Sequence, residues 1–379
     1  MTRKKTENIG GVFNPKRRAE KVGGVFNTEK RTEKVGGVFN TDSPFKFACI
    51  FLLIFGMLCL PVTHLAADAI KFATLAPKGS TWMNNFEAMG KEIRAKTDSE
   101  LQLRIYPNGV QGDELDVIRK MRAGLLHAGA MTATGLGEIQ KEVLIFQLPR
   151  LFKTYEELDY VRDFLREDLD KAFLDAGYVL IGMGDIGFYY IFSNQPIRTI
   201  ADLQSPSVKM WARTSDKIGL EFYKNAEIAT VPREVTQVLA SLYSGQINTL
   251  TASPYVTVAL QWHDKFKYMT DLPISVGVGA TVITKEKFDQ FTPEQQKILR
   301  EIGDKYQSTL IEQIRKDNDR AIEALQKKAG IQVVKFEDDA REAWDVIAME
   351  THKALVGQIY SQTFLDKINA LLEEYRKNQ

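Results

Sequence analysis

The strongest constraint on the fold is a long helical pattern in the last third of the chain. From Thr292 to Lys328 apolar residues recur at spacings of three and four, and only Gly303 interrupts them. Thr292 supplies an N-cap hydroxyl, Pro293 the first helical position, and Gln295 closes a capping box. At about 1.5 Å per residue this helix spans roughly 50 Å, more than one small domain. We therefore expect a helix over about 292–328 that braces two lobes against each other.

The chain before this helix alternates short β-branched runs with helical patterns from Asp68 onward, which is typical of an α/β protein. The predicted helices include one that opens after Ser80 and places Trp82 on its buried face, and helices over 113–123, 215–225 and 233–243. The predicted strands are 70–74, 101–106, 128–132, 178–183, 189–193, 207–211, 228–231 and 247–251.

The first 67 residues have the features of leader sequence. Three near-copies of a Gly-Gly-Val-Phe-Asn unit recur every 13 residues, a period too short for a solenoid, so we interpret residues 1–45 as a disordered leader or a misassigned start. Residues 46–67 hold a lysine, an apolar run over 47–60 and small residues at a cleavage site, which predicts a cleavable signal peptide and export. An uncleaved anchor is the alternative interpretation.

Removal of this segment changes the composition of the chain. It takes away both cysteines and leaves 39 Lys and Arg against 44 Asp and Glu, a net charge of −5. An exported chain of this size buries a core without disulfides, and no strongly basic surface favours nucleic acid as a partner.

The remaining residues also argue against catalysis. Only His127, His263 and His352 follow residue 67, with no thiol, no His-x-x-x-His and no Gly-x-Ser-x-Gly motif. No Gly-rich phosphate loop is present either. We therefore predict no enzyme activity, no metal site and no cofactor.

Several short motifs in order, over roughly residues 69–376, resemble the periplasmic solute receptors of TRAP transporters, the DctP-type family. The matching stretches include Leu103 to Gly112, Leu148 to Phe152, Ser193 to Ile197, Lys209 to Trp211, and Leu239 to Asn248. The resemblance implies a two-lobed periplasmic solute-binding fold with crossing strands, a small-molecule solute in the cleft, and closure of the lobes around it. Its implied partners are the small and large membrane subunits of an ion-driven transporter, and it implies a periplasmic monomer.

On this basis lobe I is predicted over 68–193 plus 276–310, and lobe II over 194–275 plus 311–379. The alternative function is a two-lobed binding protein that serves a sensor or another class of transporter.

The resemblance also implies two arginines that hold a solute carboxylate by paired charge-assisted hydrogen bonds. Alignment on the matching stretches places Trp211 and Tyr189 at these positions. Either the solute is apolar or aromatic and packs on these rings, or its carboxylate meets a relocated cation, or the two rings are core residues and the alignment is shifted. Arg213 is the first candidate cation, because it shares a strand face with Trp211, and Arg150 is the second.

Further candidate cleft residues follow predicted strands or open predicted helices. Trp82 lies in the first turn of a helix, Thr134 follows the strand over 128–132, and Ser253 and Tyr255 follow the strand over 247–251. Each of them has core packing as its structural alternative.

Overall fold

The computed structural model describes residues 68–379. These residues lie in one compact unit that runs from His64 to Gln379, and the predictions made for 1–45 and 46–67 fall outside the described residues. Within 68–379, no helix is both long and apolar enough to cross a bilayer.

The strands form one extended path with two halves. In the first half the order is β2-β1-β3-β9-β4, with parallel pairing of β1 to β2 and β3 and antiparallel pairing of β9 to both neighbours. Their bounds are β1 Asp68–Thr74, β2 Leu101–Tyr106, β3 Ala128–Thr132, β4 Tyr178–Ser193 and β9 Ser275–Thr284.

The second half continues from β4 through β7 and β5 to β6, while β8 pairs with β4 and β10. Their bounds are β5 Met210–Ala212, β6 Thr230–Pro232, β7 Thr249–Ala252, β8 Tyr268–Thr270 and β10 Gln332–Val334. Since β4 pairs with β9 in the first half and with β7 and β8 in the second, it crosses between the halves, and the α/β fold is two-lobed, as the resemblance implied. The assignment of each segment to a lobe remains a prediction.

The two predicted strands 178–183 and 189–193 are a single strand, β4, so predicting a break between them was wrong. The intervening Gly184 to Gly187 contains a β-bulge at Asp185 and Gly187, and Gly187 has φ of +111°. A bulge bends a strand without ending its pairing. The glycines that indicated a break therefore mark the bend in the crossing strand.

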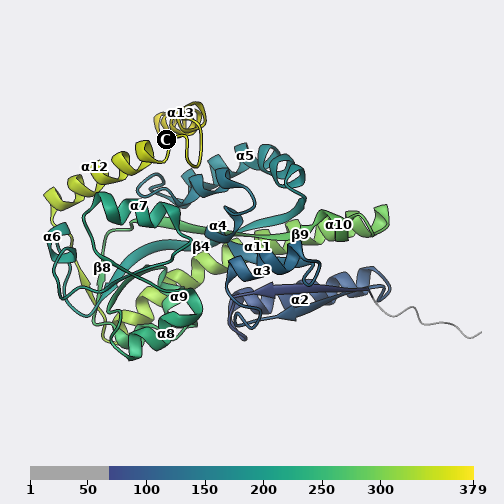
Figure 1. The fold of residues 1–379 in the computed structure, drawn as a ribbon, viewed down its shortest axis with the longest axis horizontal. Coiled ribbons are helices and arrows are strands. Elements are labelled where there is room, and N and C mark those ends of the chain that lie inside the picture. The colour runs from purple at the N-terminus through teal and green to yellow at the C-terminus, as the bar shows by residue number, and fades with distance from the viewer. Residues whose placement is uncertain (1–67) are drawn as a thin grey trace, which may run out of the picture. The chain divides into compact units, whose positions relative to one another are not determined.

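The long helix α11 covers Pro293–Lys327, with the predicted capping box between Thr292 and Gln295. Figure 1 shows it running past both groups of strands, and it contacts β4, α2 and α9. A Cβ at Gly303 would lie 2.4 Å from the Ile181 side chain, so this glycine allows the helix to approach β4 closely. The prediction of a bracing helix over 292–328 is confirmed.

The other helices pack on the strands and on one another. Helix α12 packs on α7, and α13 packs on α5 (Figure 1). The bounds are α2 Thr81–Lys96, α3 Glu114–Arg122, α4 Ala133–Leu136, α5 Tyr155–Asp175, α6 Ile200–Leu203, α7 Lys217–Asn225, α8 Val235–Tyr243, α9 Pro254–Ala259, α10 Lys285–Phe288, α12 Asp338–Ala354 and α13 Gln362–Lys377. Two 3₁₀ helices cover Lys141–Gln147 and His263–Lys265.

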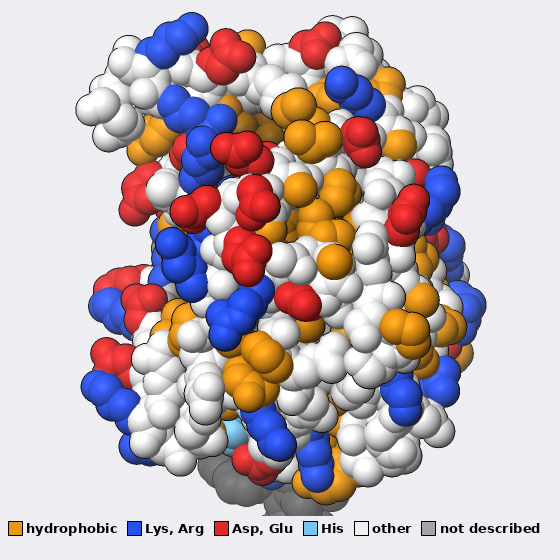
Figure 2. All heavy atoms as spheres, turned by 90° about the vertical axis from the view of Figure 1, so that its left-hand side faces the viewer, with side chains coloured by type: hydrophobic (Ala, Val, Ile, Leu, Met, Phe, Trp, Pro, Cys, Tyr) orange, Lys and Arg blue, Asp and Glu red, His pale blue; other side chains and the backbone are white. Residues whose placement is uncertain are grey.

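The surface of the described residues carries charges of both signs. Figure 2 shows lysines and arginines interspersed with acidic side chains and small apolar patches on one face. On this face no single sign dominates, so it creates no field that would steer a polyanion.

Candidate solute-binding site

A cavity of about 210 Å³ opens between the two halves of the fold. This volume is many times the roughly 10–15 Å³ that a cavity needs to admit one water, so the cavity has room for a small organic compound. Its lining comes from both sheets, from α2 and α7, and from the middle of α11. A compound in it would therefore contact both lobes at once.

Aromatic side chains form much of the wall: Trp82, Phe86, Tyr189, Trp211, Phe222, Tyr223 and Trp262. Tyr189 is half-buried on β4. A Cβ on Gly277 would lie 2.3 Å from this hydroxyl, so Gly277 makes room for the ring. The indole Nε1 of Trp211 donates to the Arg233 carbonyl at 2.8 Å, and its ring meets Trp262 edge-on at 5.7 Å between centroids.

Three more predicted site residues line the cavity, and hydrogen bonds hold the side chains of Trp82 and Thr134 in place. Trp82 Nε1 donates to the Asp185 carbonyl at 3.4 Å, and the Thr134 hydroxyl donates to Gln147 Oε1 at 3.3 Å. Arg213 follows β5, two residues after Trp211, and both line the cavity. The structure thus brings Trp82, Thr134, Tyr189, Trp211 and Arg213 together.

Ser253, Tyr255 and Arg150 are not among the lining residues. Ser253 is buried and caps α9. Tyr255 packs on Trp82 with centroids 4.8 Å apart and hydrogen-bonds to Thr81, so it supports the wall from behind. Arg150 donates to Asp345 at 2.6 Å and to the Pro273 carbonyl at 3.1 Å, outside the cavity.

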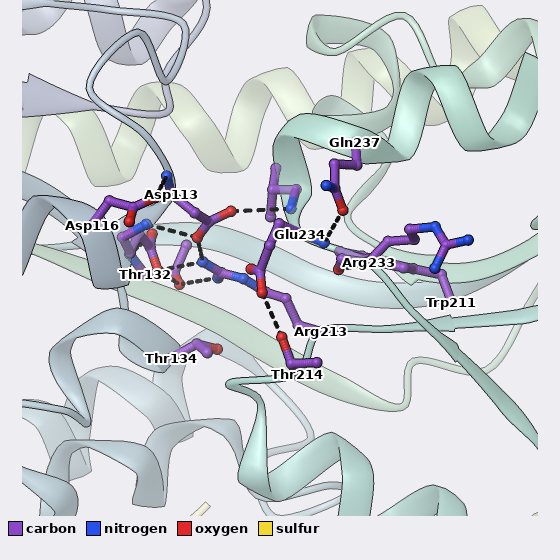
Figure 3. A network of polar contacts seen from close by, with 12 residues as sticks. Asp113, Asp116, Thr132, Thr134, Trp211, Arg213, Thr214, Arg233, Glu234 and Gln237 are labelled. Atoms are coloured by element: carbon purple, nitrogen blue, oxygen red, sulfur yellow. Dashed lines mark hydrogen bonds and ion pairs between the residues drawn. The ribbon is translucent and has the colours of Figure 1, made fainter.

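The guanidinium of Arg213 sits in a buried acidic cluster (Figure 3). Its Nη2 pairs with Asp113 and lies 3.0 Å from Glu114 Oε2, while Nη1 donates to the Thr132 hydroxyl at 3.3 Å. Glu114 also accepts hydrogen bonds from the amide and hydroxyl of Thr132, at 2.7 and 2.9 Å. Burial by itself would lower the pKa of Arg213, but the charges of Glu114 and Asp113 outweigh it and raise that pKa, so the arginine stays charged.

Among residues 68–379, Arg213 is the only lysine, arginine or histidine that lines the cavity. Its Nε is buried and has no hydrogen-bond partner within the described part of the chain. A buried charged donor is costly when unpaired.

Sequence reasoning missed further polar groups that line the cavity, namely Glu114, Gln147, Asp216 and Gln307. Asp216 caps α7 by accepting from the Gly219 amide at 2.9 Å, and burial raises its pKa although that hydrogen bond and Arg213 oppose the rise. Its position after β5 was a usable signal, since ligands gather at the carboxyl ends of such strands. Gln147 and Gln307 lie in helices and gave no such signal.

The two tyrosines nearest these acids stay protonated. Burial, together with the charge of Asp216, raises the pKa of Tyr189. Burial also raises the pKa of Tyr223, whose hydroxyl lies 2.9 Å from that of Thr251. The cavity therefore offers neutral phenols, an arginine donor, and carboxyl groups. Among residues 68–379 no cluster of metal-ligating side chains is found.

The chain is similar to known bacterial solute-binding proteins. Residues 72–360 match the family described as bacterial extracellular solute-binding protein, family 7 (DctP). The chain is 20% identical over 293 residues to the 2,3-diketo-L-gulonate-binding periplasmic protein YiaO of Escherichia coli, covering 75% of this chain and 86% of that protein. A 21% identity with the uncharacterized protein YiiZ of Salmonella typhimurium covers 56% of this chain and 64% of that protein.

Among solved structures, the fold is similar to a TRAP periplasmic solute-binding protein from Xanthobacter autotrophicus Py2 with bound β-D-galacturonate. The TM-score is 0.74 at 20% identity, over 80% of this chain and 99% of that one.

Proposed function

This chain belongs to family 7 of the bacterial extracellular solute-binding proteins, the DctP family, and on that premise we propose that it is the extracytoplasmic receptor of a TRAP-type transporter. It encloses a small organic solute in the cavity between its lobes. It then delivers the solute to small and large membrane subunits driven by an ion gradient. The family consists of solute-binding proteins and not of enzymes.

The observation that carries the proposal is Arg213, which lines the cavity and whose Nε has no hydrogen-bond partner among residues 68–379. A carboxylate or carbonyl oxygen of the solute accepts its hydrogen bond, and the hydroxyl of Tyr189 supplies a second polar contact. The rest of the solute packs on Trp82 and Trp211. A single arginine meets the acceptor here, with aromatic rings at the two positions where the family resemblance implies arginines.

The first candidate solute is a small organic acid of the sugar-acid kind. YiaO is described as binding 2,3-diketo-L-gulonate, and the Xanthobacter protein holds β-D-galacturonate. An acid of this size fits about 210 Å³.

The second candidate is a ring compound without net negative charge. Arg213 already faces Asp113 and Glu114, so a carboxylate would be a third negative group beside one cation. An uncharged carbonyl accepts from Nε without that repulsion.

The test begins with residues 68–379 purified natively and analysed by mass spectrometry for a compound released on unfolding. Thermal-shift and calorimetric titrations then compare organic acids with neutral aromatic compounds, including D-galacturonate beside D-galacturonamide as a matched pair. The proposal predicts one compound bound at one equivalent. It fails if no small organic compound co-purifies and none of either class raises the melting temperature.

A further inference from the structure

Arg213 connects elements that the sheet topology separates. It follows β5 in the second half of the sheet path, whereas Asp113 and Glu114 begin α3 and Thr132 ends β3 in the first half. Asp113 makes a second connection, because its Oδ2 accepts a hydrogen bond at 3.1 Å from the amide of Val235, the first residue of α8. Asp113 and Glu114 therefore contact two parts of the opposite half, the residue that follows β5 and the start of α8.

These contacts are shielded from water. The side chains of Arg213, Asp113 and Glu114 are 7%, 6% and 2% exposed. By contrast, Lys217 and Glu138, which also join the two halves, are 46% and 34% exposed. Water screens an exposed pair, so it contributes little, while breaking a buried pair leaves an uncompensated charge. The buried cluster therefore contributes more than the exposed Lys217–Glu138 pair to holding the two halves together.

We infer that Asp113 and Glu114 pair with Arg213 to form an inter-lobe latch. In this latch the two protein carboxylates bind the guanidinium group to which an acidic solute would otherwise bind. This inference deepens the function proposed above and rests on it for the identity of the cavity as the solute site.

The latch has two consequences. It favours the shut arrangement of the lobes, since Arg213 and its carboxylate partners come from opposite sides of the cleft. It also sets a charge rule, because a solute carboxylate must compete with Glu114 and Asp113, whereas an uncharged acceptor needs only Nε. Glu114 and Asp113 are therefore specificity-determining residues of the cavity.

Lobe closure can be measured without any solute. Residues 68–379 contain no cysteine, so Lys91→Cys on α2 and Ala240→Cys on α8, both exposed, give two clean sites for spin labels. The distance distribution between the labels is measured in the otherwise unchanged protein, in Glu114→Gln and in Asp113→Asn. We expect one short, narrow distribution in the unchanged protein and a longer or broader one in both variants.

The matched control is Glu157→Gln. Glu157 is also buried and also pairs with an arginine, Arg376 at 2.7 Å, but this pair joins α5 to α13 away from the cavity. The Glu157→Gln substitution should lower the melting temperature without changing the distances between the spin labels. If Glu114→Gln and Asp113→Asn leave the distances unchanged, or if Glu157→Gln changes them equally, the latch is refuted.

The charge rule is tested by titrating D-galacturonate and D-galacturonamide into the same variants. Glu114→Gln should tighten binding of the acid at least tenfold relative to the amide, and equal changes for both would contradict the rule. Failure of every compound to bind would count against the proposed function alone, because the label distances test the latch without a solute.

Discussion

At the scale of single residues, Arg213 carries the chemistry of the cavity because it alone among the lining residues brings a positive charge. Its Nη groups bind protein acceptors, while Nε is buried without a hydrogen-bond partner among the described residues. Truncating one partner of a buried, charge-assisted contact costs about 2–5 kcal/mol.

Arg213→Ala should therefore weaken solute binding by roughly 30-fold or more, the equivalent of at least about 2 kcal/mol. Isothermal titration measures the change. Arg150→Ala is the matched control, since Arg150 pairs with Asp345 outside the cavity and its loss should leave the affinity within about twofold. Equal losses in the two variants would show that Arg213 acts on the fold and not on the solute.

Gly277 gives a second residue-scale prediction. A Cβ there would lie 2.3 Å from the Tyr189 hydroxyl and 2.5 Å from its ring, so Gly277→Ala must displace the ring from the cavity wall. We expect about tenfold weaker solute binding and a stability loss of about 1–3 kcal/mol from overpacking. Gly90→Ala, on α2 against Leu103, is the comparison, and an affinity unchanged in Gly277→Ala would remove Tyr189 from the site.

The family resemblance indicated Trp211 and Tyr189, and strand alternation then indicated Arg213. Trp82 and Thr134 were indicated by their positions at the start of a helix and after a strand. The same reasoning could not foresee the acidic pair on Arg213, since Asp113 lies 100 positions away in the chain. Arg150 was the second candidate cation by sequence proximity to the motifs, but the fold pairs it with Asp345. Contacts between distant segments depend on how the lobes pack, which local patterns do not record.

At the scale of elements, the crossing strand β4 combines a bulge with support from α11. Gly187 has φ of +111°, and a Cβ there would lie 2.3 Å from Asn318 Nδ2. Asn318 itself donates to the Ile186 carbonyl at 3.1 Å and accepts from the Tyr255 amide at 3.1 Å. The bulge is thus tied to both α11 and α9.

Gly187→Ala should lower the free energy of unfolding by about 1–3 kcal/mol through backbone strain, with a further loss because Asn318 must move. Chemical denaturation measures it. Gly177→Ala separates the two causes, because Gly177 also has a positive φ of +86° but meets nothing within 4 Å. A cost no larger in Gly187→Ala than in Gly177→Ala would exclude the Asn318 contact as a determinant of the bulge.

The elements were more predictable than the site. The pattern over 292–328 gave α11 almost to the residue, since spacing, cap and proline agree locally. The break predicted inside β4 failed because glycines that end a strand and glycines that bend one have the same local signature, and only the pairing with β9 distinguishes them.

At the scale of the whole molecule, a half-buried histidine, His352, makes stability depend on pH. His352 on α12 lies with Nε2 2.8 Å from the Pro149 carbonyl, and burial lowers its pKa below 6.5 although that hydrogen bond opposes the shift. Below pH 6.5 the unfolded chain takes up a proton that the folded protein resists. Stability should therefore fall as pH decreases from 6.5 through the folded pKa.

His352→Gln keeps a donor for the Pro149 carbonyl but does not titrate. Between about pH 7.5 and 5, its melting temperature should decline less than that of the unchanged protein measured in the same buffers and salt. Parallel declines would mean that His352 is not the group responsible, leaving His127, whose pKa burial also lowers, as the remaining source.

The account as a whole claims that the lobes of this DctP-family protein close on a solute whose acceptor oxygen meets Arg213. A crystal structure of natively purified residues 68–379 with their solute tests this directly. The predicted result is density for one small organic compound between Trp82, Tyr189 and Trp211, with an oxygen about 2.7–3.2 Å from Arg213 Nε. Density for the compound elsewhere, or a solute in the cavity that leaves Nε without a contact, would contradict it.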